Sequence, residues 1–214
     1  MTKIIGVTQL KGGAGRSTVS INLSAELSSQ HQVTVIDCDL PQGTTSSWYA
    51  LRSEIGKTGN LLLNNAENET ELIDKVKRRM GIDDYIVIDA PPRIAEVTRA
   101  ILILADLLII PVASTAMDFW ATQDLLDIVN DASKHNESLT YKILWNRFRS
   151  IAKSTNQLKE LVNDAEYPVL KTTLGLRTAY PDSIAEGLSV SEYSDKKAAF
   201  ELQELAKEIK QICN

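Results

Sequence analysis

Residues 11–18 read KGGAGRST and follow KIIGVT (3–8), a short apolar segment with the composition of a buried strand. The glycines of this loop permit backbone conformations that a Cβ atom would forbid, so successive N–H groups can converge on phosphate oxygens. A predicted helix begins near Ser17 and adds the positive end of its dipole. This order of strand, loop and helix predicts a phosphate-binding loop formed by Gly12, Gly13, Ala14, Gly15, Arg16, Ser17 and Thr18.

The polar residues of this loop have distinct expected roles. We expect Ser17 to be a magnesium ligand and Thr18 to make another phosphate contact, while Arg16 neutralises the β- and γ-phosphate oxygens. A glycine-rich turn can also serve only to pack a strand against a helix. The position of the loop and its two hydroxyl groups favour phosphate binding over that alternative.

The rest of the chain alternates between short apolar segments and stretches of helical length. The predicted strands are 3–8, 33–37, 85–92, 106–112 and 141–146, and 170–175 is a candidate for a final strand. The predicted helices are 17–30, 67–80, 94–105, 118–135, 153–165 and 195–212, with a turn expected at Pro181. This alternation predicts an α/β fold in which a doubly wound, mostly parallel sheet is flanked by helices, in one domain over residues 1–214.

Three aspartates stand where predicted strands end: Asp37 and Asp39 in VIDCD, and Asp89 in IVIDAPP. Ligands of doubly wound sheets bind at the carboxyl ends of the strands. Nucleotide-bound magnesium needs an acidic residue nearby, directly or through water. Each aspartate taken singly is as well explained as a helix cap or turn former. Together with the glycine loop, they indicate a magnesium site.

The composition excludes a globally basic nucleic-acid binder, because the net charge is −5, although a local basic patch stays possible. No apolar run approaches the roughly 18 residues of a membrane-spanning helix, so we expect a cytoplasmic protein. Cys38 and Cys213 lack the spacing of a zinc site, and His31 and His135 lack catalytic or metal-binding company. We therefore interpret these four residues as structural or surface positions.

Several motifs together resemble the deviant Walker ATPases of the ParA/MinD family. KGGAGRST matches the family loop, DCDLPQG matches its D-x-D-P-Q-G, and VIDAPP matches its later D-x-P-P. The likeness extends to VSINLSAELS after the loop and to SIAEGLSVSEY before the last helix, so it covers nearly the whole chain. The sequence departs from the family at Arg16, where lysine is usual, and at Leu40, an extra residue before PQG. The resemblance implies a P-loop NTPase fold and is closest to the small ParA proteins.

The resemblance also implies a mechanism, with ATP and Mg²⁺ as cofactors. ATP would be hydrolysed slowly to ADP and phosphate, with Lys11, Arg16 and Asp39 as the catalytic residues. Asp39 would orient the attacking water and, with Ser17 and Asp89, would hold magnesium. Lys11 would reach across a nucleotide sandwich homodimer to the phosphates of the partner chain, so dimerisation would depend on ATP.

Two further positions are assigned by the resemblance. Asn146 and Arg147, at the end of a predicted strand, are candidates for binding the adenine and its surroundings, and a polar turn is the alternative. Asp118 lies in a segment that would contact the dimer partner, and a helix cap is equally plausible there.

The family's partners are nonspecific DNA and a ParB-like activating protein linked to a cargo. The resemblance thus implies a nucleoid-associated protein that segregates or positions a plasmid, a chromosome or another large cargo. Arg149, Lys153 and Arg177 are candidate DNA contacts, and an ordinary solvated charged face is the alternative. Membrane binding is disfavoured because the last helix alternates its apolar residues with glutamates.

Two other functions stay open. Arg16 is not interchangeable with the usual lysine, because a planar guanidinium binds differently from a compact ammonium, which favours a nucleotide-dependent binding protein impaired in hydrolysis. The other is a MinD-like membrane-associated regulator.

Overall fold

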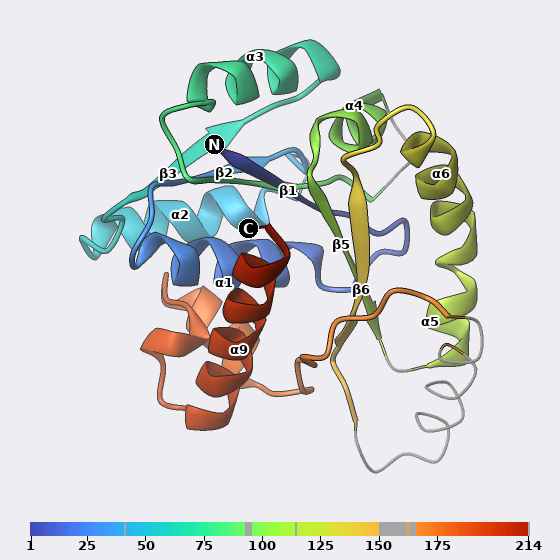
Figure 1. The fold of residues 1–214 in the computed structure, drawn as a ribbon. Helices are drawn as coiled ribbons and strands as arrows, with labels where there is room; N and C mark the ends of the chain where they lie inside the picture. Colours follow the sequence, from blue (N-terminus) through green and yellow to red (C-terminus); the bar gives the residue numbers. More distant parts are fainter. Residues whose placement is uncertain (41, 93–95, 114, 150–161, 163–165, 214) are drawn as a thin grey trace.

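The computed structural model describes residues 1–40, 42–92, 96–113, 115–149, 162 and 166–213. Its centre is a six-stranded sheet in the order β3-β2-β4-β1-β5-β6, in which each strand pairs with its neighbours in parallel (Figure 1). The strands are β1 (Lys3–Val7), β2 (Val33–Asp37), β3 (Leu61–Asn65), β4 (Tyr85–Asp89), β5 (Leu107–Ala113) and β6 (Thr140–Asn146). This arrangement confirms the predicted α/β fold with helices around a parallel sheet.

Helices cover both faces of the sheet (Figure 1). One face carries α1 (Arg16–Ser28), α2 (Thr44–Glu54), α8 (Ala179–Ala185), the short helix η1 (Val190–Glu192) and α9 (Lys196–Cys213). The other face carries α3 (Glu69–Arg79), α4 (Glu96–Leu104), α5 (Ala116–Trp120) and α6 (Gln123–Ser133). Because both faces are covered, the central strands are apolar at successive positions rather than at alternate ones.

The alternation of side chains along each strand divides the core into two layers. In β1, Ile5 and Val7 pack with α1 and α9, whereas Ile4 packs with α3 and α4. Gly6 lets α4 approach β1 closely, because a Cβ atom at Gly6 would lie 2.6 Å from Cγ2 of Ile101. These layers hold the carboxyl ends of β1, β2 and β4 in a fixed arrangement.

One predicted element differs from the structure in this region, and two elements of the structure were not predicted. Residues 118–135 form two helices rather than one, since the chain turns at Thr122, whose hydroxyl bonds to the Asp118 carbonyl oxygen and to Gln9. Helix α2 and strand β3 were not predicted, because α2 begins with the polar run TTSS and β3 is a short edge strand ending in two asparagines. The predicted helix 153–165 falls almost entirely outside the described residues.

The expectation of a final strand at 170–175 is wrong, because this segment makes only isolated bridges, between Ile143 and Val169 and between Phe148 and Gly175. Carboxylates of α9 accept its backbone N–H groups instead, as in the bonds from Lys171 and Thr172 to Glu208. Pro181 does not form a turn but lies in the first turns of α8, where its missing N–H costs little.

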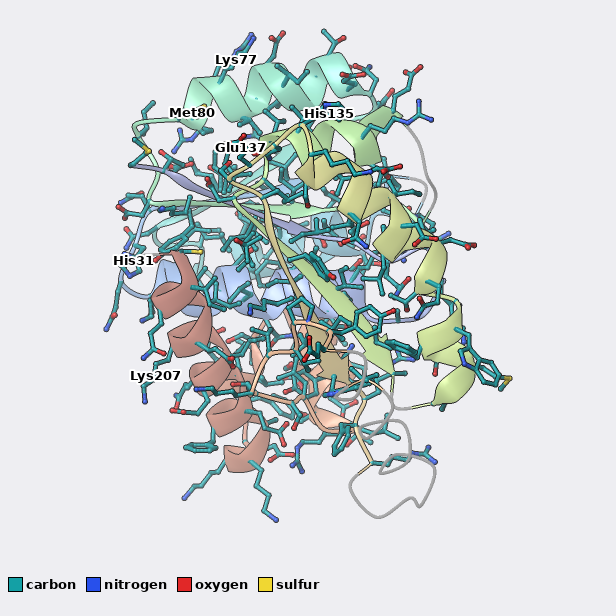
Figure 2. All side chains as sticks on the ribbon, turned by 45° about the vertical axis from the view of Figure 1, so that its right-hand side comes forward. His31, Lys77, Met80, His135, Glu137 and Lys207 are labelled. Atoms are coloured by element: carbon teal, nitrogen blue, oxygen red, sulfur yellow. The ribbon has the colours of Figure 1, made fainter. Side chains whose placement is uncertain are left out.

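His31 and His135, which we interpret as surface residues, lie on the outside of the molecule (Figure 2). Figure 2 shows His135 and Glu137 near the end of α6, and His31 on the opposite side of the molecule. The His31 ring packs edge-on against Tyr85, with centroids 5.2 Å apart, and its Nδ1 lies 3.6 Å from Asp84. Among the helices that the structure describes, none is both long and apolar enough to cross a membrane.

Candidate nucleotide site

The predicted site residues gather at the carboxyl edge of the sheet because of the strand register. Val7 pairs with Asp89, and Asp89 pairs in turn with Asp37 on the next strand. The glycine loop leaves β1 directly beside these two aspartates and ends at the first residue of α1. Three segments that are distant in sequence therefore meet where doubly wound folds bind ligands.

A pocket of about 370 Å³ lies at this edge. The glycine loop and the start of α1 form one wall, and Asp39 with the start of α2 forms the facing wall. The lining residues are Gly12, Gly13, Gly15, Arg16, Ser17, Thr18, Asp39, Gln42, Thr44, Pro92 and Arg147. The volume falls within the usual range of small-molecule sites, roughly 300–1,000 Å³. Gln42, Thr44 and Pro92 were not predicted, although they lie in or beside the motifs DLPQG and IDAPP.

Position 15 requires glycine for two reasons, its backbone conformation and the close approach of Asn146. It precedes α1 with φ 92°, a left-handed conformation that side chains disfavour. A Cβ atom there would lie 2.2 Å from Nδ2 of Asn146, which donates a hydrogen bond to the Ala14 carbonyl oxygen at 2.8 Å. Asn146 is 3% exposed and so braces the loop from the end of β6.

Arg16 is buried and faces the backbone of its own loop. Its Nε donates to the carbonyl oxygen of Ala90 at 3.0 Å, and one Nη donates to those of Gln9 and Lys11 at 2.7 and 3.1 Å. The other Nη lies 3.6 Å from Oδ2 of Asp39, and the Arg16 side chain is 8% exposed. The guanidinium thus ties the loop to β4 and to Asp39 while it still lines the pocket. A lysine could not make this set of contacts, because its ammonium is a single point.

Asp39 is held facing the pocket by its surroundings. Its backbone N–H donates to Oδ1 of Asp37 at 3.0 Å, and its carbonyl oxygen accepts from the N–H groups of Gln42 and Gly43 at 3.0 and 2.8 Å. This turn accommodates the extra residue Leu40 before α2 begins. Asp37 itself is fully buried and binds Ser46, so it supports the loop rather than the ligand.

Asp89 lies behind the pocket and is completely buried. It accepts hydrogen bonds from Thr45 Oγ1 at 2.6 Å and from Ser20 Oγ at 3.2 Å, and it also interacts with the Ser17 hydroxyl. Burial raises the pKa of Asp89 to about 6, although the bonds from Thr45 and Ser17 oppose the shift. Asp89 thus contacts the Ser17 hydroxyl from behind the pocket and is not among the residues that line it.

Ser17 and Asp39 carry oxygen groups of the type that binds magnesium. The Ser17 hydroxyl and the Asp39 carboxylate line the same pocket as the glycine loop, and Mg²⁺ prefers oxygen ligands shared between protein and phosphate. In the part of the chain that the structure describes, no cluster of three or more His, Cys, Asp or Glu could hold a metal alone.

A smaller pocket of about 130 Å³ adjoins the first and shares Thr18 and Arg147 with it. It is lined by Thr18, Asn146, Arg147, Gly175, Leu176, Arg177, Tyr180 and Pro181. The expected base-binding residues Asn146 and Arg147 lie here, beside a loop that sequence reasoning did not assign to the site. That loop is joined to β6 by the N–H of Leu174, which donates to the Trp145 carbonyl oxygen at 2.9 Å.

Lys11 lines neither pocket and pairs with Asp118 of the same chain. Thr115 also donates to Asp118, at 2.5 Å. Burial would raise the pKa of Asp118, but the bonds from Lys11 and Thr115 outweigh it and hold the pKa below its usual value. The structure therefore brings together the two residues that were expected at a dimer interface.

The candidate DNA contacts fall in different surroundings. Arg177 makes a two-point ion pair with Glu201 of α9, with its shortest contact 2.6 Å, and its side chain is only partly exposed. Arg149 is exposed, whereas Lys153 lies outside the described residues. Most of the charge of Arg177 is thus engaged within the chain.

Gln9 is a further residue beside the glycine loop that sequence analysis did not single out. Its side-chain oxygen accepts from the N–H of Leu10, and its nitrogen donates to Thr122 Oγ1 at 2.9 Å. Gln9 is 1% exposed and joins the glycine loop to the start of α6. Gln9 can reach Thr122 because β1, which precedes Gln9, pairs with β5, which leads into α5 and α6.

Comparison with known proteins agrees with this geometry. The family model described as "ATPase MipZ" matches residues 3–171. Maintenance of carboxysome distribution protein A of Halothiobacillus neapolitanus is 27% identical over 208 residues, which are 96% of this chain and 95% of that protein. Sporulation initiation inhibitor protein Soj of Bacillus subtilis is 25% identical, with 98% of both chains covered. Apo McdA of Cyanothece has the same fold, with a TM-score of 0.81 at 17% identity over 98% of this chain and 100% of that one.

Proposed function

The chain belongs to the ATPase MipZ family, within the ParA/MinD type, and on that basis we propose that it is an ATP-switched positioning ATPase. It binds ATP with Mg²⁺, forms a homodimer around the nucleotide, and hydrolyses ATP slowly to ADP and phosphate. The dimer binds DNA without sequence preference, and a cargo-linked protein stimulates its return to the monomer. Residues 1–214 act as one nucleotide-binding domain.

The observation that carries the proposal is the 370 Å³ pocket, in which the glycine loop faces Asp39. Backbone N–H groups of the loop and the N-terminus of α1 suit the phosphates of ATP. The adjoining 130 Å³ pocket then suits the adenine, because it continues past Thr18 and Arg147. Arg147 has φ 52°, so its backbone is held in an uncommon conformation where the two pockets meet.

The chain's own residues divide the chemistry between them. Asp39 orients the water that attacks the γ-phosphorus, the bond to the β–γ bridging oxygen breaks, and ADP and phosphate are released. Ser17, positioned by Asp89, and Asp39 hold Mg²⁺, which supplies charge neutralisation at the β- and γ-phosphates when it is bound. Arg16 ties the loop to β4 and to Asp39, which leaves few of its donors for a phosphate and keeps hydrolysis slow.

Dimerisation requires Lys11 to leave Asp118. The side chain of Lys11 is 42% exposed, so it can exchange its carboxylate partner for a phosphate of a second subunit without unfolding the loop. The neighbouring α5 side chains Met117 and Trp120 are 70% and 63% exposed, which is unusual for residues of this size. An exposed apolar pair beside the releasable lysine supports a second copy docking on this face.

The test combines binding and association. ATP with Mg²⁺ should shift the sedimentation of the chain from monomer to dimer, whereas ADP should not, and Lys11→Ala should bind ATP but remain monomeric. Retention on DNA should require ATP and weaken with salt. A chain that binds ATP but sediments as a monomer in all these conditions contradicts the proposal.

The cargo is proposed from the relatives. Two relatives that match this chain over most of their length are named for carboxysome distribution. Others are named for inhibition of sporulation initiation and for chromosome partitioning. A carboxysome or similar large protein body is thus the favoured cargo, ahead of a plasmid or chromosome. Fluorescence microscopy of the labelled protein in cells tests this ranking of cargoes. If the protein moves with a plasmid locus and not with a protein body, the plasmid becomes the favoured cargo.

A nucleotide-dependent binding protein impaired in hydrolysis is the second candidate. It is supported by the contacts of Arg16, which commit its donors to three carbonyl oxygens and to Asp39. In that case ATP would drive dimerisation and DNA retention with no measurable phosphate release. Phosphate release with and without DNA separates the two candidates.

A further inference from the structure

The buried side-chain amide of Gln9 joins the glycine loop to the helices that follow β5. Its Oε1 accepts from the N–H of Leu10 at 2.8 Å and from that of Lys11 at 3.5 Å. Its Nε2 donates to Thr122 Oγ1 at 2.9 Å and to the Pro111 carbonyl oxygen at 3.3 Å. Both donor and both acceptor positions of the amide are therefore used, at 1% exposure of the residue.

These contacts form part of a closed ring that includes the Lys11–Asp118 ion pair. Gln9 donates to Thr122, and the Thr122 hydroxyl donates to the Asp118 carbonyl oxygen at 2.9 Å. The Asp118 carboxylate pairs with the Lys11 ammonium, and the Lys11 N–H donates back to Gln9. Thr122 is fully buried, so water does not compete at the middle of the ring. Gln9 thus fixes the backbone of Lys11 relative to the turn that follows Asp118.

Arg16 connects this ring to the nucleotide pocket. The same Nη donates to the Gln9 carbonyl oxygen at 2.7 Å and to the Lys11 carbonyl oxygen at 3.1 Å. Arg16 also lines the 370 Å³ pocket, so a phosphate bound there would attract its guanidinium. Any change in the contacts of Arg16 therefore acts directly on the backbone of Gln9 and Lys11.

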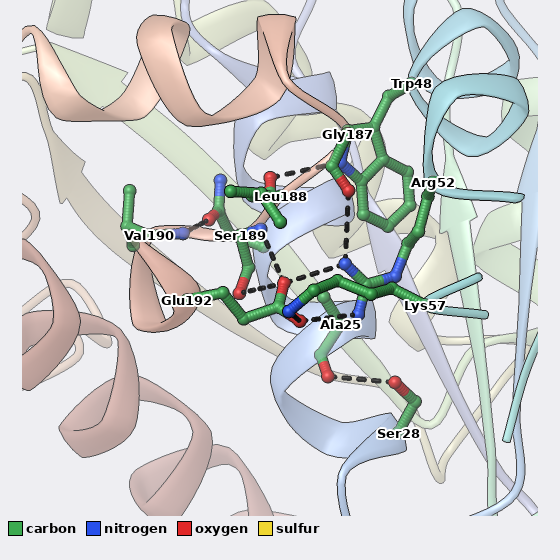
Figure 3. Close-up of polar contacts among 11 residues, drawn as sticks. Ala25, Ser28, Trp48, Arg52, Lys57, Gly187, Leu188, Ser189, Val190 and Glu192 are labelled. Atoms are coloured by element: carbon green, nitrogen blue, oxygen red, sulfur yellow. Dashed lines mark hydrogen bonds and ion pairs between the residues drawn. The ribbon is translucent and has the colours of Figure 1, made fainter. Parts of the chain in front are cut away.

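Another buried polar network provides a structural contrast. Arg52 of α2 donates to Glu192 at 2.7 Å and to the Gly187 carbonyl oxygen at 3.2 Å (Figure 3). These three residues line neither nucleotide pocket, and their contacts join α2 to the segment around η1. The ring around Gln9 differs, because it holds the lysine that the proposed dimer requires.

We propose that Gln9 is a positioning residue that transmits nucleotide binding in the glycine loop to α5. A fully hydrogen-bonded buried network is rigid, so Gln9 holds Lys11 and the exposed α5 side chains Met117 and Trp120 as one unit. This role rests on the proposed function, because it needs nucleotide in the loop and a second subunit on α5. Gln9 is the side chain through which the first controls the second.

Hydrogen–deuterium exchange of the full-length chain, with and without ADP and Mg²⁺, tests this connection in the monomer. In the wild type, ADP should slow amide exchange about tenfold both at residues 12–15 and at residues 116–122. Thr122→Val removes the hydroxyl of the ring but keeps its shape. The slowing should then persist at residues 12–15 and fall below about twofold at residues 116–122. Thr122→Ser keeps the hydroxyl and should restore the slowing.

Gln9→Leu and a control variant complete the comparison. Gln9→Leu should act like Thr122→Val, and the double variant should be no worse than either single one, because both changes remove the same connection. Ser28→Ala is the matched control, since the Ser28 hydroxyl is also buried and donates to a carbonyl oxygen of its own helix, that of Ala25, at 2.8 Å (Figure 3). This variant should respond to ADP like the wild type.

Sedimentation equilibrium with ATP gives a second readout. Thr122→Val should dimerise about tenfold more weakly than the wild type with an unchanged affinity for ADP, a division that a general loss of stability would not produce. Equal slowing at residues 116–122 in the wild type and Thr122→Val, an unchanged dimer, or an equal loss in Ser28→Ala would overturn the role of Gln9.

The exchange data also separate this role from the proposed function. If ADP slows exchange at residues 116–122 only when the Thr122 hydroxyl is present, but ATP forms no dimer, the connection is supported and the proposed dimer is contradicted. If ADP slows exchange nowhere, residues 12–15 included, the proposed nucleotide site and the role of Gln9 both fail.

Discussion

At the scale of single residues, Arg16 is the most informative departure from the family pattern. Its donors serve the carbonyl oxygens of Gln9, Lys11 and Ala90, so little of its hydrogen-bonding capacity reaches a phosphate. A lysine cannot satisfy these acceptors together and is free to extend into the pocket. We expect Arg16→Lys to raise the rate of phosphate release about tenfold, equivalent to about 1.4 kcal/mol.

The same variant should be slightly less stable, because the carbonyl oxygens lose buried partners. A loss of about 1–2 kcal/mol in urea unfolding is expected. A rate that falls in Arg16→Lys would show instead that the guanidinium itself contacts the reacting phosphate.

The raised pKa of buried Asp89 predicts that the stability of the fold depends on pH. Its pKa is raised by burial from 3.8 to about 6, so between these values the folded chain keeps a proton that the unfolded chain has released. The free energy of unfolding therefore falls as the pH rises through this window. By pH 7 the total loss of stability from Asp89 is at most about 3 kcal/mol. Asp89→Asn should remove this slope.

Urea unfolding between pH 4 and 7, without nucleotide or Mg²⁺, checks the prediction. The variant should gain stability relative to the wild type as the pH rises, and should bind ATP with Mg²⁺ more weakly because Ser17 loses its positioning carboxylate. Equal slopes in the two proteins would place the pKa of Asp89 near its ordinary value.

At the scale of elements, the docking of α9 depends on two glutamates that accept backbone N–H groups of residues 171–175, while Leu170 and Leu174 donate to carbonyl oxygens of β6. Glu201 accepts from Arg177, from Tyr180 and from the N–H of Gly175, whereas Glu208 accepts from Lys171 and Thr172. This explains why residues 170–175 run beside β6 without becoming a strand. The segment that lines the smaller pocket is therefore held in place by α9.

We expect Glu201→Gln to lower the free energy of unfolding by about 2 kcal/mol, the scale of a hydrogen-bonded charge pair. It should also weaken ATP binding, because Arg177 and Tyr180 line the smaller pocket. Glu204→Gln on the same helix is the control, since Glu204 is more exposed and lies 3.6 Å from Lys207. Similar losses in both variants would mean that the general charge of α9, rather than this contact, matters.

At the scale of the whole molecule, the pairing of Lys11 with Asp118 opposes assembly of the proposed dimer. Asp118→Asn removes the charge that holds Lys11 in its own subunit, so the lysine becomes available to the phosphates of a partner. We expect ATP-dependent dimerisation to become about tenfold tighter in sedimentation equilibrium, equivalent to about 1.4 kcal/mol.

Asp131→Asn supplies the matched control, because Asp131 pairs with Lys134 on the exposed surface of α6. That variant should dimerise like the wild type. Weaker dimerisation of Asp118→Asn would show that Asp118 contacts the second subunit rather than restraining Lys11.

The sequence by itself determined the nucleotide loop and the parallel sheet. Glycines, a following helix and buried strands ending in aspartate are local features, and their spacing is enough to predict Gly12–Thr18, Asp39 and Asp89 as neighbours. The resemblance to the ParA/MinD family, confirmed by the family match, rests on the same short motifs.

Only the tertiary structure decided how these residues are used. Asp89 stands behind Ser17 because β4 pairs with β1 in one register, and Arg16 turns to the carbonyl oxygens because the loop folds over it. The restraint of Lys11 by Asp118 and the loop beside Arg147 both join segments far apart in the chain. Contacts of this kind depend on packing and burial, which no local pattern of residues encodes.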